Sequence, residues 1–351
     1  MASALACALP LLAAAASPVG DALQRPALQI QAPQRAVLLS AALAGERIVA
    51  VGERGLIATS DDGGRQWRQA PSPVSVTLTM LRFADARHGV AIGHGGTVLV
   101  STDAGASWSL RLDGRRIAQL AMDAAKDPAA PPEARRDAER LLADGPDKPL
   151  LDLLLWDARR MLVVGAYGLA LHSADGGQSW TPWMARLPNP RGLHWYVARR
   201  AGDSLVLAGE QGLLVRSDDG GASFRPLASP YKGSWFTGEL AADGSLLLAG
   251  LRGNVWRSAD GGLGREPWQA LASPQPASIT SSLRLADGRL LLANQAGQVL
   301  ALHGESLAPL NPAPIPMPAA LLALRDGRLL SFGMAGVVPV SDRPNAQGAR
   351  P

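Results

Sequence analysis

Seven copies of one unit constrain this chain more than any other feature. Each copy starts with a small or apolar residue and then a short glycine-containing turn, as in VGERGLIATSDDGGRQW and VGAYGLALHSADGGQSW. All intervals between copies except one are about forty residues, and such internal repetition decides the fold class before any other signal. The copies begin at Val51, Ile92, Val164, Ala208, Ala249, Ala293 and Phe332.

The residues of each unit predict β-strands. An apolar run such as RIVAVG or SLLLAG precedes the glycine, and a second run such as LIATS or TVLVS follows it. Alternation at every second residue predicts strands, and the G-x-x-G link suits a hairpin turn. An upstream strand and a short downstream strand complete four antiparallel strands. The predicted fold is therefore all-β, a seven-bladed β-propeller of four-stranded antiparallel blades.

A second turn in most units carries the more specific pattern S-x-D-x-G-x-[ST]-W, which is typical of Asp-box, or BNR, repeats. Its aspartate accepts turn N–H groups, its glycine takes positive φ, and its aromatic ring packs between neighbouring sheets. Because the same turn recurs around the ring, we interpret it as a structural element, with Trp67, Trp108 and Trp180 as core anchors rather than sugar platforms. The residues assigned to it are Ser60, Asp62, Gly64, Trp67, Ser101, Asp103, Gly105, Trp108, Ser173, Asp175, Gly177, Trp180, Ser217, Asp219, Gly221, Phe224, Ser258, Asp260 and Gly262.

Two segments depart from the repeat. The last unit ends after VVPVSD, short of a fourth strand, and ALQIQAP (residues 27–33) is predicted to supply the outer strand of the last blade. The long interval holds an insertion at about residues 112–149, between blades two and three. Helical spacing in RRIAQLAMDAAKD, a proline start at Pro131 or Pro132 and a stop at 144–146 predict two short helices. They form either a solvated hairpin or part of a binding surface.

The N-terminus predicts export. Residues 5–16 form an apolar stretch that is too short for a permanent bilayer anchor, and the single cysteine, Cys7, lies within it. We divide the chain into a signal peptide (1–22), a single propeller (23–345) and a disordered tail (346–351). The expected location is periplasmic. Since no later run is long and apolar enough, no stable membrane anchor is expected.

The loops predict a contact surface. Turns between the second and third strands share a face with the links between blades, and that face gathers basic and polar side chains. Guanidinium groups there suit acidic segments or carboxylates. The sequence has a net charge of +4 and only three lysines among 34 basic residues, but it has no basic block, so no nucleic acid is expected. The predicted contact residues are Arg54, His94, Arg115, Arg116, Tyr167, Arg191, Lys232 and Arg252, with Gln211 among the turn residues.

Catalysis is not predicted. A sialidase-like site needs a nucleophilic tyrosine with a carboxylate, an acid/base aspartate and clustered arginines. Only Tyr167 has a nearby candidate, Glu210, and the five histidines are scattered, so neither a catalytic set, a metal site nor a cofactor is expected. The alternative left open is a glycan-binding propeller or a sialidase-like glycoside hydrolase.

Two stretches resemble a known family. Phe83, Asp85, Gly89 and Gly93 followed by STDAGASW, together with DKPLLDLLLWDARRMLVVGAYG (Asp147 to Gly168), resemble the bacterial photosystem II stability/assembly factor-like propellers, over residues 35–340. The resemblance implies an assembly chaperone. Photosynthetic relatives bind a membrane subunit through an arginine-lined face, and other bacterial relatives are exported and often accompany RND-type exporters. The arginines of the photosynthetic relatives have no position-by-position match here, so the resemblance assigns no binding residue in this chain.

The function expected from these observations is a non-catalytic periplasmic scaffold, or an assembly or stability factor for a membrane protein complex. Its expected partner is a membrane or periplasmic protein, with an RND-type exporter suggested by the resemblance alone. The expected oligomeric state is a monomer.

Overall fold

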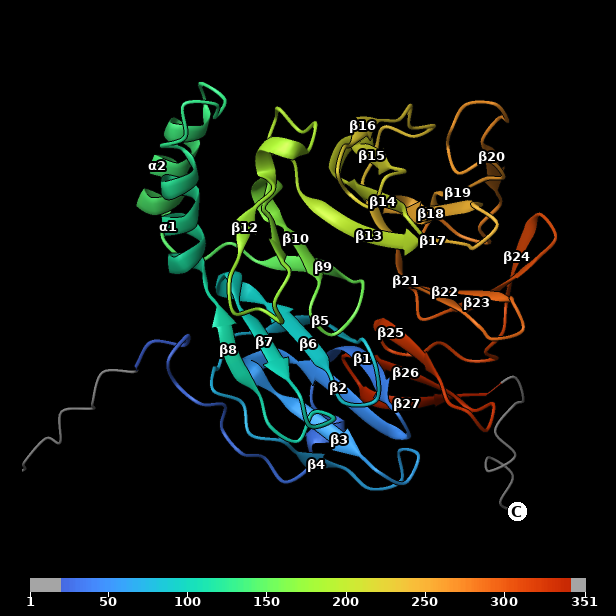
Figure 1. The fold of residues 1–351 in the computed structure, drawn as a ribbon. Helices are drawn as coiled ribbons and strands as arrows, with labels where there is room; N and C mark the ends of the chain where they lie inside the picture. Colours follow the sequence, from blue (N-terminus) through green and yellow to red (C-terminus); the bar gives the residue numbers. More distant parts are fainter. Residues whose placement is uncertain (1–19, 342–351) are drawn as a thin grey trace, which may run out of the picture.

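The computed structural model describes residues 20–341, in which the strands form seven antiparallel sheets arranged around one axis (Figure 1). The first three blades are β1 (Leu38–Ala44), β2 (Arg47–Gly52), β3 (Ile57–Ser60) and β4 (Arg68–Gln69); β5 (Leu78–Phe83), β6 (Gly89–Gly93), β7 (Val98–Ser101) and β8 (Ser109–Leu112); β9 (Leu150–Leu155), β10 (Met161–Gly165), β11 (Ala170–Ser173) and β12 (Thr181–Pro182).

The next three blades are β13 (Trp195–Ala201), β14 (Ser204–Gly209), β15 (Leu214–Ser217) and β16 (Arg225–Pro226); β17 (Trp235–Leu240), β18 (Leu246–Gly250), β19 (Val255–Ser258) and β20 (Gln269–Leu271); β21 (Ile279–Arg284), β22 (Leu290–Asn294), β23 (Val299–His303) and β24 (Ser306–Pro309). The seventh is β25 (Pro318–Ala323), β26 (Leu329–Gly333) and β27 (Gly336–Val340). The inner strands contact one another in order, and β25 contacts β1, so the ring closes. The predicted seven-bladed propeller is confirmed.

Apolar layers between adjacent blades form the core. The second strands are buried almost throughout because they have a neighbouring blade on each face, as the patterns of β6 and β10 show. The turn aromatics pack into the same layers. Trp108 and Trp180 are each 7% exposed, whereas Trp67 is half-buried with its ring edge on Phe332 of the seventh blade. The burial of these rings between blades is what holds neighbouring sheets at a fixed distance.

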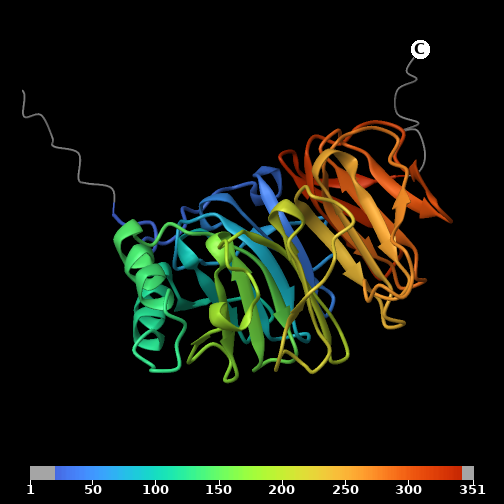
Figure 2. The ribbon, with the colours of Figure 1, turned by 90° about the horizontal axis from the view of Figure 1, so that it is seen from above.

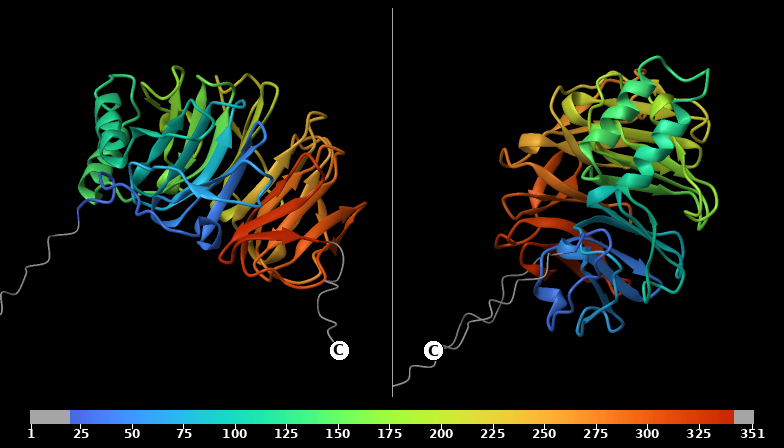
Figure 3. Two further views of the ribbon diagram at one scale, coloured as in Figure 1. Left: turned by 90° about the horizontal axis from the view of Figure 1, so that it is seen from below. Right: turned by 90° about the vertical axis from the view of Figure 1, so that its left-hand side faces the viewer.

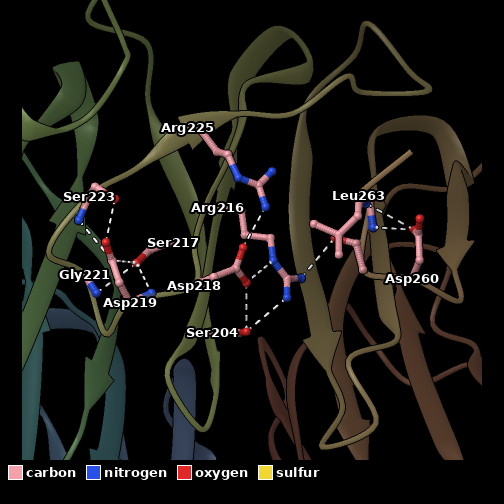
Figure 4. A network of polar contacts seen from close by, with 12 residues as sticks. Ser204, Arg216, Ser217, Asp218, Asp219, Gly221, Ser223, Arg225, Asp260 and Leu263 are labelled. Carbon is pink, nitrogen blue, oxygen red and sulfur yellow. Dashed lines mark hydrogen bonds and ion pairs between the residues drawn. The ribbon is translucent and has the colours of Figure 1, made fainter. Parts of the chain in front are cut away.

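The Ser-Asp-Gly turns of the first five blades share one hydrogen-bond pattern, drawn for the fourth blade in Figure 4. The Ser217 hydroxyl donates to Asp219 Oδ1 (2.7 Å) and accepts from the Gly221 amide (2.9 Å). The Ser223 amide and hydroxyl both donate to the Asp219 carboxylate (3.0 and 2.5 Å). In the first three blades the tryptophan Nε1 also donates to the turn glycine carbonyl. Each turn is thus held by its own side chains.

These turns predict acid sensitivity. The pKa of Asp175 is lowered to about 2, because the hydroxyl and amide of Ser179 donate to its carboxylate, and the pKa of Asp219 is lowered in the same way. A carboxylate whose pKa is lower in the folded protein than in the unfolded chain stabilises the fold. That stabilisation is complete above the unfolded pKa of about 4, and it is lost as pH falls through the folded pKa. We expect the melting temperature to fall between about pH 4 and pH 2. The double variant Asp175→Asn/Asp219→Asn should have a lower melting temperature than the unmutated protein at pH 6. Its melting temperature should also fall less between about pH 4 and pH 2. An equal fall in both proteins would mean that these carboxylates do not cause the acid sensitivity.

The seventh blade corrects one prediction. Residues 27–33 do not form its outer strand, and within residues 20–341 that blade has three strands. The segment instead follows the first blade: the Ala27 amide donates to the Ser72 carbonyl (3.1 Å), and the Gln69 side chain bonds the backbone of Leu28 and Ile30. The chain reaches β27 only at the 3-10 turn η1 (Pro33–Arg35). These bonds and the proline at residue 33 leave no extended run beside β27.

The insertion forms the two predicted helices, α1 (Gly114–Ala124) and α2 (Ala134–Asp144), between β8 and β9. Asp113 caps α1 by accepting from the Arg116 amide (2.9 Å), and α2 ends at Gly145, which has positive φ. Ile117 and Ala118 of α1 are buried, and Ile117 joins the core between the second and third blades. The hairpin lies at the perimeter of the ring, beside the outer strands (Figures 1 and 2). The signal peptide, apart from residues 20–22, and the tail predicted at 346–351 lie outside the described residues.

Candidate functional site

The β2–β3 turn and its counterparts in the next four blades lie on one face, together with the links between blades. We call this the loop face. The turns are the 3-10 turns η2 (Glu53–Gly55), η3 (His94–Gly96), η4 (Ala166–Gly168), η6 (Glu210–Gly212) and η7 (Leu251–Gly253). Because strands in a blade alternate in direction, every second connection returns to the same face. The views from above, from below and from the left-hand side show loops at the ends of the blades (Figures 2 and 3).

The turns hold their exposed side chains in a fixed, left-handed conformation. Arg54, Tyr167, Gln211 and Arg252 have φ between 52° and 56°, and Gly95 takes this place in the second blade. A non-glycine residue at such φ carries a conformational cost that the surrounding structure must offset. Strained residues that persist cluster at functional sites, and the same turn repeats in blades one to five. The loop face therefore presents these side chains on a rigid frame.

Four exposed cations of the loop face have no ion pair within the described residues. Within residues 20–341, Arg54, Arg191, Lys232 and Arg252 are exposed and have no carboxylate partner. Near the opposite ends of the blades, arginines pair with nearby aspartates: Arg47 with Asp61, Arg160 with Asp157, Arg225 with Asp218, Arg289 with Asp287 and Arg328 with Asp326. These four cations of the loop face are therefore available to acidic groups of a partner, although Glu53 is exposed in the same turn as Arg54.

The predicted contact residues do not form one cluster. Arg191 reaches Gln211, with Nη1 2.8 Å from Oε1, so a link and a turn meet there. Arg115 is committed to an ion pair with Asp21 at the start of the described chain. Arg116 and His94 are exposed near the base of the insertion. Arg54, Lys232 and Arg252 belong to separate blades or links, so they mark a broad ring rather than a pocket.

A row of rings on the third to fifth blades was not predicted from the sequence. Tyr167 is 62% exposed, and its ring centroid lies 4.9 Å from that of His194. His194 contacts Tyr196, and Tyr196 contacts Phe236 at 5.4 Å. Tyr196 and Phe236 occupy the bulge at the start of inner strands β13 and β17. We call these four residues the aromatic row; it runs from the loop face toward the axis, and Lys148 Nζ lies 5.3 Å from its outer ring, Tyr167.

Tyrosine and carboxylate meet in this row, although not at the pair suggested by the sequence. Glu210 Oε2 accepts from the His194 amide (3.2 Å), and His194 Nδ1 lies 3.3 Å from the Tyr196 hydroxyl. Burial raises the pKa of Tyr196, and the nearby Glu210 charge raises it further. In this row Glu210 therefore bonds the His194 backbone, and the imidazole of His194 contacts the Tyr196 hydroxyl.

A buried ion cluster fixes the inner strands beneath the loop face. Asp152 of β9 is fully buried and accepts from Arg82 of β5 (3.0 Å), Arg199 of β13 (2.5 Å) and the Ala198 amide (2.9 Å). Its pKa is lowered because the two guanidinium charges outweigh the effect of burial. Arg199 Nε in turn donates to the Gly238 carbonyl of the fifth blade. Four blades are therefore tied together around the axis.

Residues 20–341 contain no group of three or more His, Cys, Asp or Glu side chains placed to hold a metal ion. In the same residues, neither helix is long and apolar enough to cross a membrane.

The comparisons identify the fold. No protein-family model and no curated protein matches the chain. Among solved structures, YCF48 bound to D1 peptide has a TM-score of 0.63 at 17% identity, covering 92% of this chain and 99% of that one. YCF48 from Cyanidioschyzon merolae has a TM-score of 0.63 at 14% identity, covering 90% and 98%. The WD40 β-propeller domain of Doa1 has a TM-score of 0.63 at 10% identity, covering 93% and 98%. At these identities the chain is shown to share the propeller fold of these proteins.

Proposed function

We propose that this chain is a non-catalytic, exported scaffold of the periplasm that binds a membrane or periplasmic protein through its loop face, as an assembly or stability factor. The likeness to YCF48 bound to D1 peptide, over 92% of this chain, carries the proposal. The repeat architecture supports it, because a ring of rigid turns offers a broad contact surface. The photosystem II assembly factor-like resemblance in the sequence points the same way, and an RND-type exporter is one partner of this kind.

The charge pattern supports an acidic segment as the bound element. Arg54, Arg191 and Arg252 are free of ion pairs within the described residues, so a partner carboxylate need not displace an existing salt bridge. The row of Tyr167, His194, Tyr196 and Phe236 adds apolar and π surface beside them. Interfaces of proteins favour this combination of arginine and aromatic side chains.

The test is a cross-linked pull-down from detergent-solubilised membranes. We expect the mature protein to capture a specific membrane partner, and we expect Arg54→Ala/Arg191→Ala/Arg252→Ala to lose at least about 90% of it, because a total loss of about 1.4 kcal/mol already lowers affinity tenfold. The matched control, Arg159→Ala/Arg200→Ala/Arg257→Ala, removes three exposed arginines near the opposite ends of the blades. Equal capture by both variants would mean that the partner does not use these loop-face arginines. No partner with any of the proteins would move the function to a small ligand or a glycan.

A further inference from the structure

Within residues 20–341 no fourth strand pairs with β27, the outer strand of the seventh blade, which contacts β26 and the 3-10 turn η1. In the other blades a fourth strand pairs with the third; β3, β7 and β15 are buried along their whole length, and β19 and β23 each have one exposed residue. In contrast, β27 pairs only with β26 within the described residues, and its pattern is one buried, three half-buried and one exposed residue. An uncovered edge with unpaired backbone groups is a template for another strand.

A groove runs along this edge. Its volume is about 560 Å³, and it lies between the sixth blade, the seventh blade and the turn of the first blade. Leu285, Leu291 and Leu310 line it from the sixth blade, Val337 and Val340 from β27, and Trp67 from the first. The groove occupies the position that a fourth strand would take. Its floor is apolar, so an apolar side chain would gain from burial there.

The complete blades show what fits such a position. Their fourth strands are two to four residues long, from β4 and β12 to β8 and β24. In three of them one leucine is driven into the layer between blades: Leu112, Leu271 and Leu307 are 2%, 4% and 6% exposed. The groove therefore suits a short extended segment with a leucine-sized residue directed inward.

Three guanidinium groups lie at one end of the groove. Arg65, Arg289 and Arg328 line it, and no aspartate or glutamate does. Arg289 and Arg328 already pair with Asp287 and Asp326, whereas Arg65 has no carboxylate partner within residues 20–341. All three belong to turns of the face opposite to the loop face, where an antiparallel fourth strand would begin. A carboxylate placed just before the apolar residues would meet Arg65.

We propose that β27 is a second binding site, which takes an extended peptide segment of a partner protein by strand addition. The segment carries a carboxylate followed by two to four alternating apolar residues. Since Gly333 and Gly336 close a two-residue hairpin, Val337 and Pro339 turn their backbone groups to the open edge. Pro339 has no N–H, so the added strand receives one donor, from Val337, and two acceptors. This site is separate from the loop face.

The experiment titrates the purified protein into a fluorescein-labelled peptide, Glu-Glu-Ser-Leu-Ala-Leu-Gly, whose Glu-Ser-Leu-Ala core copies residues 305–308 of the sixth blade. We expect saturable binding, weaker binding by about tenfold for Arg65→Glu, and unchanged binding for the matched control Arg265→Glu in the turn of a complete blade. Lys-Lys-Ser-Leu-Ala-Leu-Gly should bind more weakly. Amide exchange at residues 337–341 should slow when the acidic peptide binds, because Val337 gains a partner.

The outcomes are decisive in each direction. Binding without slower exchange at 337–341, or equal loss in Arg65→Glu and Arg265→Glu, overturns the site. If amide exchange at 337–341 slows as protein concentration rises in the absence of peptide, the edge binds a second copy of this chain instead. If amide exchange at 337–341 is slow without peptide and becomes fast when residues 342–351 are removed, the edge binds the chain's own C-terminus. Arg54→Ala/Arg191→Ala/Arg252→Ala should bind the peptide unchanged, so failure here and failure of the loop face are separable.

Discussion

Replacing Asp152 with alanine should lower the free energy of unfolding by about 3–5 kcal/mol, the range for removing one member of a buried ion pair. The carboxylate is fully buried and accepts from Arg82, Arg199 and the amides of Leu153 and Ala198. Without it, Arg199, whose side chain is 13% exposed, keeps its charge without a carboxylate within bonding distance. The measurement is urea unfolding followed by circular dichroism.

A matched control distinguishes this cluster from an ordinary surface pair. Asp157 of the same blade is about half exposed and pairs with Arg160 at 2.7 Å. Asp157→Ala should cost about 1 kcal/mol or less, as for exposed pairs and turn caps. Similar losses for Asp152→Ala and Asp157→Ala would mean that the inner cluster does not hold the blades together.

Gly209→Ala should destabilise the protein by about 3 kcal/mol, at the upper end of overpacking effects. Its φ of −171° is extended backbone, which alanine adopts freely, so the cost is steric. A Cβ there would lie 2.0 Å from the carbonyl oxygen of His194, which belongs to the backbone and has little room to move. The substitution should also displace the turn at 210–212, and thereby Gln211 from Arg191. Thermal melting measures the loss of stability, and tryptophan fluorescence reports the displacement of the turn.

The control here is Gly202→Ala in the β13–β14 hairpin of the same blade. A Cβ at that position meets nothing within 4 Å, although φ is +58°. Only the left-handed conformation is then unfavourable, at about 1 kcal/mol. If Gly209→Ala proved as mild as Gly202→Ala, the close backbone approach would not constrain the turn.

The repeat accounts for most of the fold that could be predicted. The glycine at the start of each hairpin recurs because a Cβ there would strike the carbonyl of the residue just before the inner strand, at 2.0–2.3 Å for Gly52, Gly93, Gly165 and Gly209. The sixth blade carries Asn294 at this place, where the turn lacks the 3-10 geometry of the first five blades. The helical insertion was predictable from its helical spacing, its proline start and its stop at 144–146. The path of residues 27–33 was not, because alternation in a sequence does not say which neighbour the chain reaches.

The candidate site was predicted only in part. Turn residues such as Arg54 and Tyr167 were found because the repeat aligns them. His194, Tyr196 and Phe236 were missed, since they meet only when separate blades fold against each other. One signal was present: Tyr196 and Phe236 hold the same bulge position of successive units. Asp152 likewise could not be distinguished from a surface aspartate until its arginine partners on β5 and β13 were placed.

The most direct test of the loop face as a protein-binding surface is site-specific photo-cross-linking in membranes. A photoreactive amino acid replaces Tyr167 or Gln211 on the loop face, and Asp203, an exposed residue of the β13–β14 turn on the opposite face, in a control. The proposed function predicts one discrete adduct from the loop-face positions and none from position 203. Adducts from position 203 alone, or equal adducts from both faces, would contradict it.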